Sequence, residues 1–177
     1  MSAVQQDYRT RATIDHDIWQ QMPVLYAWAR LPGARIIELG VRGGNSTSAF
    51  LAGIERSGGE LWSVDIEEPE VPAHWRDLTR WHLLVADDQS QEAVAFCPDN
   101  VDVLFIDTSH FYEHTLTELR LYVGKVKPGG VVLLHDTDKR EWPDVSRALN
   151  DYCGSTGLDW YEHPFWHGLG VIEVPRA

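Results

Sequence analysis

The sequence predicts an α/β fold: one doubly wound, mostly parallel, seven-stranded sheet with helices on both faces and a C-terminal antiparallel hairpin. Short apolar runs alternate with amphipathic stretches, as in successive βα units. A glycine-rich turn joins the first of these runs to a helical stretch. The last two runs, residues 158–162 and 170–174, are separated by one short loop, which is typical of a hairpin. With 177 residues the chain is expected to form a single domain over residues 1–177.

The first 34 residues are expected to form a helical segment that precedes the sheet. Residues 1–12 are polar and are expected to be frayed. Thr13 is expected to cap a helix over residues 14–29, because apolar side chains recur there every three or four positions. Pro23 interrupts this pattern and predicts a kink or two short helices.

The sheet is expected to occupy residues 35–177. Residues 103–106 are apolar on both faces, which predicts a central parallel strand. Residues 67–80 contain two prolines and are expected to form a loop and a short helix over the site. The expected strands are residues 35–39, 60–65, 81–85, 101–107, 131–134, 158–162 and 170–174, and the expected helices are residues 46–56, 89–96, 112–125 and 144–153.

Composition excludes several classes of function. Asp and Glu number 27 against 15 Lys and Arg, a net charge of −12, so we expect no nucleic-acid partner. No apolar run approaches the roughly 20 residues that span a bilayer, and no signal-peptide pattern is seen, so we expect no membrane association. Cys97 and Cys153 lack metal-binding spacing, and a reduced, cytoplasmic setting is expected.

The turn after the first predicted strand is the strongest local feature. Its glycines are Gly40, Gly43 and Gly44, and a helix is expected to begin at Ser46. Glycines let the backbone approach a ligand closely, and the N–H groups of the helix start face the same place. The alternative is a tight connection within the sheet. Glu38, an acid inside the apolar strand, favours a binding turn, although the dinucleotide fingerprint G-x-G-x-x-G is not matched.

Acids follow the second and third predicted strands. Asp65 is in position to accept hydrogen bonds from ribose hydroxyls, or else it caps a turn. Asp87 and Asp88 follow the next strand, where an acid can reach an adenine amino group. The alternative for Asp88 is to cap the helix over residues 89–96.

Polar clusters follow the fourth and fifth predicted strands. The first runs from Asp107 to His110, and the second is His135-Asp136-Thr137-Asp138. Because ligands bind beyond the carboxyl ends of parallel strands, we expect these two aspartates and two histidines to converge in one site. The alternative is a set of structural hydrogen bonds.

The sequence resembles class I S-adenosylmethionine-dependent methyltransferases, specifically the group of macrocin O-methyltransferases and cephalosporin hydroxylase-like proteins. The segments that carry the resemblance are residues 36–47, 61–65, 104–119 and 126–137, and the most specific patterns are Ile106-Asp107-x-x-His110-x-Tyr112-Glu113 and Pro128-Gly129-Gly130 followed by His135-Asp136. The resemblance implies a Rossmann-like methyltransferase fold and S-adenosylmethionine as cofactor. It also implies O-methylation of a small-molecule hydroxyl, in a natural product or a sugar.

The resemblance and the strand ends together give the expected site residues. Those expected to bind the cofactor are Glu38, Gly40, Val41, Gly43, Asn45, Ser46, Asp65, Ile66, Asp87, Asp88 and Asp107. His110, Asp107 and His135 are the expected catalytic residues. Aromatic residues, among them Trp142 and Trp166, are candidates for binding the acceptor.

Two mechanisms remain open. In one, Asp107, Asp136 and His135 hold Mg²⁺ or another divalent metal that lowers the pKa of the acceptor hydroxyl. In the other, His110 is the general base, oriented by Asp107 or Asp136. Metal-dependent relatives often carry a further acid beside the residue matching Asp136, whereas its neighbours here are His135 and Thr137. A non-catalytic cofactor-binding or assembly subunit is the rival function, and a homo-oligomer that completes the site is also considered.

Overall fold

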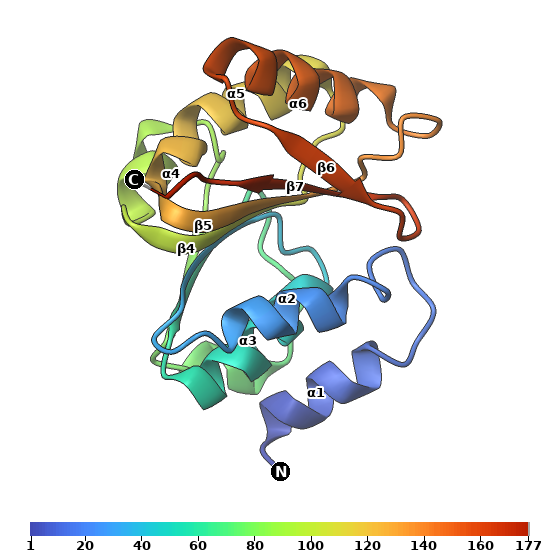
Figure 1. The fold of residues 1–177 in the computed structure, drawn as a ribbon. Helices are drawn as coiled ribbons and strands as arrows, with labels where there is room; N and C mark the ends of the chain where they lie inside the picture. Colours follow the sequence, from blue (N-terminus) through green and yellow to red (C-terminus); the bar gives the residue numbers. More distant parts are fainter. Residues whose placement is uncertain (177) are drawn as a thin grey trace.

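The protein forms a seven-stranded sheet between two layers of helices (Figure 1). The structure is a computed structural model that describes residues 1–176. The strand order is β3-β2-β1-β4-β5-β7-β6. The strands are β1 (Arg35–Leu39), β2 (Glu60–Asp65), β3 (Trp81–Val85), β4 (Val101–Ile106), β5 (Val126–His135), β6 (Trp160–His163) and β7 (Leu169–Glu173). The helices are α1 (Ala3–Arg11), α2 (Met22–Ala29), α3 (Asn45–Ser57), η1 (Ala73–Asp77), α4 (Gln91–Phe96), α5 (Tyr112–Tyr122), η2 (Val123–Lys125) and α6 (Pro143–Thr156).

Strand pairing confirms the predicted doubly wound sheet and its hairpin. Strands β1 to β5 are parallel, whereas β7 pairs antiparallel with both β5 and β6. The strand order reverses at β1, which lies between β2 and β4. At such a switch point the connections leave toward opposite faces and open a crevice at the carboxyl ends of the strands.

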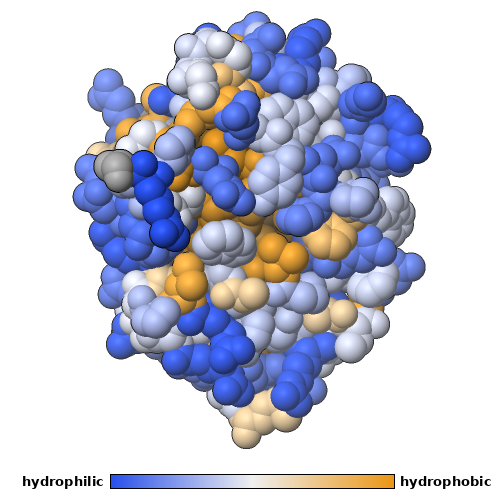
Figure 2. Space-filling view, viewed as in Figure 1, coloured by the Kyte–Doolittle hydropathy of each residue, from blue (hydrophilic) through white to orange (hydrophobic). Residues whose placement is uncertain are grey.

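Two hydrophobic cores fill the space between the sheet and the helix layers. Successive side chains of a strand point to opposite faces, so Ile36 and Phe105 belong to one core and Ile37 and Leu104 to the other. All four are completely buried. The first core packs against α1, α2 and α3, and the second against α4, α5 and α6, as the layers in Figure 1 show. Figure 2 shows that hydrophobic side chains reach the surface in the middle of the face that carries β5 and β7.

The N-terminal segment differs from the prediction. Residues expected to be frayed form α1, because Val4 is buried in the first core and the Gln5 side chain donates to the Ala52 carbonyl of α3 at 2.5 Å. The helix expected over residues 14–29 is also wrong, since only Met22–Ala29 is helical. Pro23 stands in the first turn of α2, where its missing N–H costs nothing, and it therefore starts a helix without kinking one.

Several other element bounds also differ: β6 begins at Trp160 and not at residue 158, and α6 extends to Thr156 and not only to residue 153. Strand β5 begins at Val126 and not at residue 131, because Gly129 and Gly130 pair with the backbone of Val174 beyond β7. Helix α4 begins at Gln91, where Ser90 is the N-cap and accepts from the Ala93 N–H, so Asp88 does not cap this helix. Among residues 1–176, no helix has the length and apolar character needed to span a membrane.

Candidate active site

The glycine turn lies at the switch point between β1 and β4. Gly40 has φ of +89° and Gly44 has φ of +77°, a backbone region that residues other than glycine rarely adopt. A Cβ at Gly40 would also collide with the backbone carbonyl of Asp107. Gly40 is therefore required both for its conformation and for the close approach of the two strand ends.

Glu38 lies beneath this turn and is completely buried. Its carboxylate accepts hydrogen bonds from the hydroxyls of Ser46 at 2.6 Å, Thr47 at 3.0 Å and Ser63 at 2.6 Å. Burial raises the pKa of Glu38 to about 7, against the opposing effect of these hydroxyl donors. Glu38 thus joins β1, α3 and β2 under the turn, and its direct contact with a cofactor stays a prediction.

Asp65 holds the turn from the end of β2. Its Oδ2 accepts hydrogen bonds from the backbone N–H groups of Val41 at 2.7 Å and Arg42 at 2.8 Å. Its Oδ1 accepts from the Glu67 N–H at 3.0 Å, so the residue also caps its own turn. Arg42 has φ of +49°, and these hydrogen bonds stabilise that unusual backbone conformation.

Two adjoining cavities flank the glycine turn. One of about 340 Å³ lies over the ends of β2, β3 and β4, and one of about 170 Å³ lies over the start of α3. Gly40, Arg42 and Asp107 line both, so the two cavities form one continuous cleft. Every residue predicted to bind the cofactor, except Glu38, lines this cleft: Gly40, Val41, Gly43, Asn45, Ser46, Asp65, Ile66, Asp87, Asp88 and Asp107.

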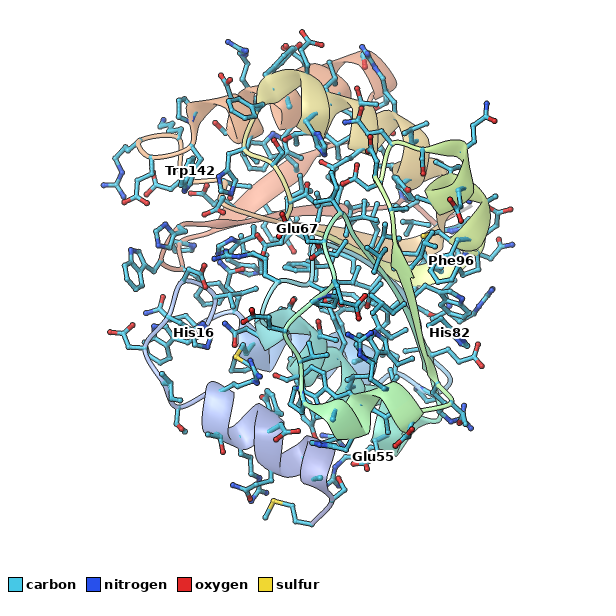
Figure 3. The ribbon with its side chains drawn as sticks, turned by 180° about the vertical axis from the view of Figure 1, so that it is seen from behind. His16, Glu55, Glu67, His82, Phe96 and Trp142 are labelled. Carbon is cyan, nitrogen blue, oxygen red and sulfur yellow. The ribbon has the colours of Figure 1, made fainter. Side chains whose placement is uncertain are left out.

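Several residues of the cleft lie in segments that gave no signal in the sequence. Arg11 of α1 donates to the Gly43 carbonyl at 2.7 Å and to Asn45 Oδ1 at 2.8 Å. Asp17 and Ile18, between α1 and α2, line the smaller cavity. In Figure 3, His16 of this segment and Trp142 before α6 lie on the same side of the molecule, below and above the sheet. Only a pattern linking these distant segments to the glycine turn could have identified them.

The two polar clusters after β4 and β5 converge as predicted, and Asp136 lies at their centre. Its Oδ2 is 2.6 Å from His110 Nε2 and 2.9 Å from His135 Nδ1. His135 Nδ1 also lies 3.2 Å from Asp107 Oδ1. A third histidine, His167 from the β6–β7 loop, lies 3.8 Å from Asp136 Oδ1 and was not recognised in the sequence as part of this cluster.

Asp136 is held in an unusual backbone conformation, with φ of +58°. Such strain is found at functional sites, where the surrounding contacts stabilise it. Burial alone would raise the pKa of Asp136, but hydrogen bonds from His110 and His135 lower it below the ordinary value. The carboxylate is therefore ionised at neutral pH and faces the histidines as an acceptor.

His110 and His135 have different environments. Burial alone would lower the pKa of His135, but Asp107 and Asp136 outweigh it and raise the pKa to about 10. His135 is thus a buried cation between two carboxylates, and only 2% of its side chain is exposed. The His110 side chain is 33% exposed, and its ring lies against Trp142 with centroids 3.9 Å apart. Of the two, His110 is the one that a bound molecule can reach.

One part of this cluster offers the kinds of ligand atom that hold a metal ion in proteins. Asp107, His110 and Asp136 each offer a ligand atom, and these atoms lie within 4.8 Å of one another. Two carboxylates and one imidazole are suitable donors for Mn²⁺, Fe²⁺ or Zn²⁺, and the carboxylates also for Mg²⁺. His135, which was expected among the ligands, instead places its Nδ1 between the two carboxylates.

Residues 37–137, more than half of the chain, match the family described as "Methyltransferase domain". An uncharacterized protein y4gI of Sinorhizobium fredii is 25% identical over 185 residues, which cover 89% of this chain and 19% of that protein. An uncharacterized protein R132 of Acanthamoeba polyphaga mimivirus is 35% identical over 54 residues, covering 30% of this chain and 24% of that protein. The matched stretches thus span about a fifth to a quarter of the length of these relatives.

Solved structures share the whole fold at low sequence identity. A protein from Corynebacterium glutamicum is 15% identical with a TM-score of 0.72, covering 100% of this chain and 92% of that one. Rv0187 from MTB, solved with its cofactor, is 16% identical with a TM-score of 0.72 and the same coverage. The MycE methyltransferase of mycinamycin biosynthesis, in complex with Mg and SAH, is 18% identical with a TM-score of 0.70, covering 99% of this chain and 56% of that one.

Proposed function

The chain belongs to the methyltransferase-domain family, within the class I S-adenosylmethionine-dependent methyltransferases, and on this basis we propose that it methylates a hydroxyl group of a small molecule. The observation that carries the proposal is the contact of 2.6 Å between His110 and Asp136. This pair lies beside Asp107, which lines both cavities of the cleft. A general base therefore adjoins the place where the methyl group would be held.

The residues that line the cleft favour one orientation of bound S-adenosylmethionine. The smaller cavity, over the glycine turn and the start of α3, accommodates the methionine end. The larger cavity contains Asp65 for the ribose hydroxyls and Asp87 for the adenine amino group. The sulfonium then lies near Gly40 and Asp107, which the two cavities share.

His110 is proposed to remove the proton of the acceptor hydroxyl. The hydroxyl oxygen attacks the methyl carbon while the carbon–sulfur bond breaks, and that electron pair stays on sulfur to give S-adenosylhomocysteine. The proton passes to a nitrogen of the His110 imidazole. Asp136 accepts a hydrogen bond from the ring, fixes its orientation and stabilises the imidazolium.

A divalent metal would be held by Asp107, His110 and Asp136, and it would supply a Lewis acid that lowers the pKa of the hydroxyl. Mg is present in the MycE complex, which supports this alternative for the same fold. His110 is a ligand in one alternative and a free base in the other, so the two predict different responses to added metal.

The acceptor is proposed to be an apolar or sugar-bearing small molecule. Phe111, which follows His110, is 75% exposed, and the ring of Trp142 lies against His110. Trp166 is 49% exposed and stacks on His167, the third histidine of the cluster. A net charge of −12 does not favour a nucleic-acid acceptor. We also propose that a second copy of the chain covers the cleft and completes the site.

Calorimetric titration with S-adenosylmethionine and S-adenosylhomocysteine, with and without Mg²⁺, tests the cofactor site. Hydroxylated acceptors are then screened for S-adenosylhomocysteine release. We expect His110→Gln and Asp136→Asn to keep cofactor binding and to lose at least about a hundredfold in turnover, the usual contribution of a general base. A chain that binds cofactor but shows no turnover with any acceptor would favour the rival function, a cofactor-binding or assembly subunit.

A further inference from the structure

A second cluster of metal-ligand side chains lies outside the reactive group. Asp88 follows β3, and His114 and Glu118 both come from α5. One ligand atom of each residue lies within 4.8 Å of the others. His114 Nε2 is 3.2 Å from Asp88 Oδ1 and 3.8 Å from Glu118 Oε1. From the sequence, Asp88 was predicted to bind the cofactor, and His114 and Glu118 had no predicted role.

The position of these residues on α5 follows from their spacing. Residues four apart on a helix lie on the same face, so His114, Glu118 and Tyr122 form one stripe along α5. The Tyr122 hydroxyl donates to the Asp88 carbonyl at 2.5 Å, which fixes the loop after β3 against this stripe. The loop thereby turns the Asp88 carboxylate toward the side chains of α5.

The carboxyl group of Glu118 is the unusual feature of this cluster. Glu118 is completely buried, and within residues 1–176 its Oε2 has no hydrogen-bond partner. Its other oxygen accepts a hydrogen bond from Thr108 at 2.6 Å, which orients the group. Asp88, whose carboxylate approaches Glu118, is itself only 9% exposed. Two buried carboxyl groups that face each other need a positive charge or a shared proton beside them, because burial of uncompensated charge is costly. A protonated His114, 3.2 Å from Asp88, is one source of that charge, and a bound cation is another.

We propose that Asp88, His114 and Glu118 bind a divalent cation of the Zn²⁺ type. One imidazole and two carboxylates are suitable ligands for Zn²⁺, and the larger cavity, which Asp88 and His114 line, gives an entry path and room for a water ligand. Thr108 and Tyr122 supply the outer hydrogen bonds that hold such ligands in place. The cation joins the loop after β3 to α5 below the larger cavity, and this role does not depend on the acceptor or on methyl transfer.

The test measures Zn²⁺ binding in the Asp136→Asn background, which removes a carboxylate from the other candidate metal group. We expect calorimetry to show one Zn²⁺ per chain in this variant, and Co²⁺ to give a visible absorption band. Adding His114→Gln or Glu118→Gln should weaken Zn²⁺ binding at least about tenfold. Glu113→Gln is the matched control for Glu118→Gln, since it makes the same substitution at an exposed position of α5.

Thermal unfolding gives a second measurement, because a ligand that binds only the folded chain raises its stability. Zn²⁺ should raise Tm of the Asp136→Asn variant and not that of the double variant with His114→Gln. His114 is partly exposed, with 29% of its side chain accessible, so this substitution leaves the core intact. No Zn²⁺ binding to Asp136→Asn, or equal binding after His114→Gln, would overturn the proposal and leave a proton, on His114 or between the carboxyl groups, as the source of charge compensation. Neither result depends on whether the protein transfers a methyl group.

Discussion

Glu38 gives the protein a pH-dependent stability whose size follows from the structure. The carboxyl group is completely buried, and its pKa is raised from 4.5 to about 7. The folded chain therefore binds this proton more tightly than the unfolded chain does. The resulting stabilisation is complete below pH 4.5 and is lost as pH rises through about 7. A shift of this size corresponds to about 3 kcal/mol of unfolding free energy.

The perturbation that isolates this contribution is Glu38→Gln. The amide has similar shape, does not titrate, and keeps an oxygen that accepts from Ser46 or Ser63. Between about pH 5 and about pH 8, the unfolding free energy of the wild type should fall by about 2 to 3 kcal/mol more than that of the variant. Other titrating groups are common to both proteins and cancel in the difference.

Urea unfolding of the cofactor-free protein, followed by circular dichroism at several pH values, measures this difference. Glu70→Gln is the matched control, because Glu70 is exposed and its substitution makes the same charge change. That control should follow the wild type at every pH. If Glu38→Gln also ran parallel to the wild type, the buried carboxyl group would not have the raised pKa from which this reasoning starts.

Three further predictions concern the glycine turn and its contacts. Gly40→Ala should lower the unfolding free energy by more than about 2 kcal/mol, because φ is +89° and the new Cβ would meet the Asp107 carbonyl. Gly43→Ala, with open space around its Cβ, should change the unfolding free energy by less than about 1 kcal/mol in the same denaturation experiment. Asp65→Ala should weaken S-adenosylhomocysteine binding at least about tenfold in calorimetry, since two N–H groups of the turn lose their acceptor; unchanged affinity would contradict this role. Arg11→Gln should weaken the same binding about threefold to tenfold, whereas the exposed neighbour Arg9, changed to Gln, should have no effect.

Local sequence was sufficient to predict an element when the residues of that one segment indicate its structure. The central strand β4 was predicted from a short apolar run, because a strand buried on both faces must be apolar at consecutive positions. The glycine turn was predicted from its glycines, since few other residues adopt a positive φ. Local sequence failed for α1, whose polar residues form a helix because Val4 and Gln5 contact the first core and α3.

The sequence by itself determined the order of the strands and of the helices that follow them, and it placed Asp65, Asp107 and Asp136 at strand ends. These ends lie together because parallel strands present their carboxyl ends at one edge of the sheet. Only the tertiary structure decided which of these groups face one another. It brought His167 to Asp136 and Arg11 to the glycine turn across long stretches of chain. The physical reason is that burial and pairing of charge depend on how the layers pack, and no local pattern in the sequence encodes that packing.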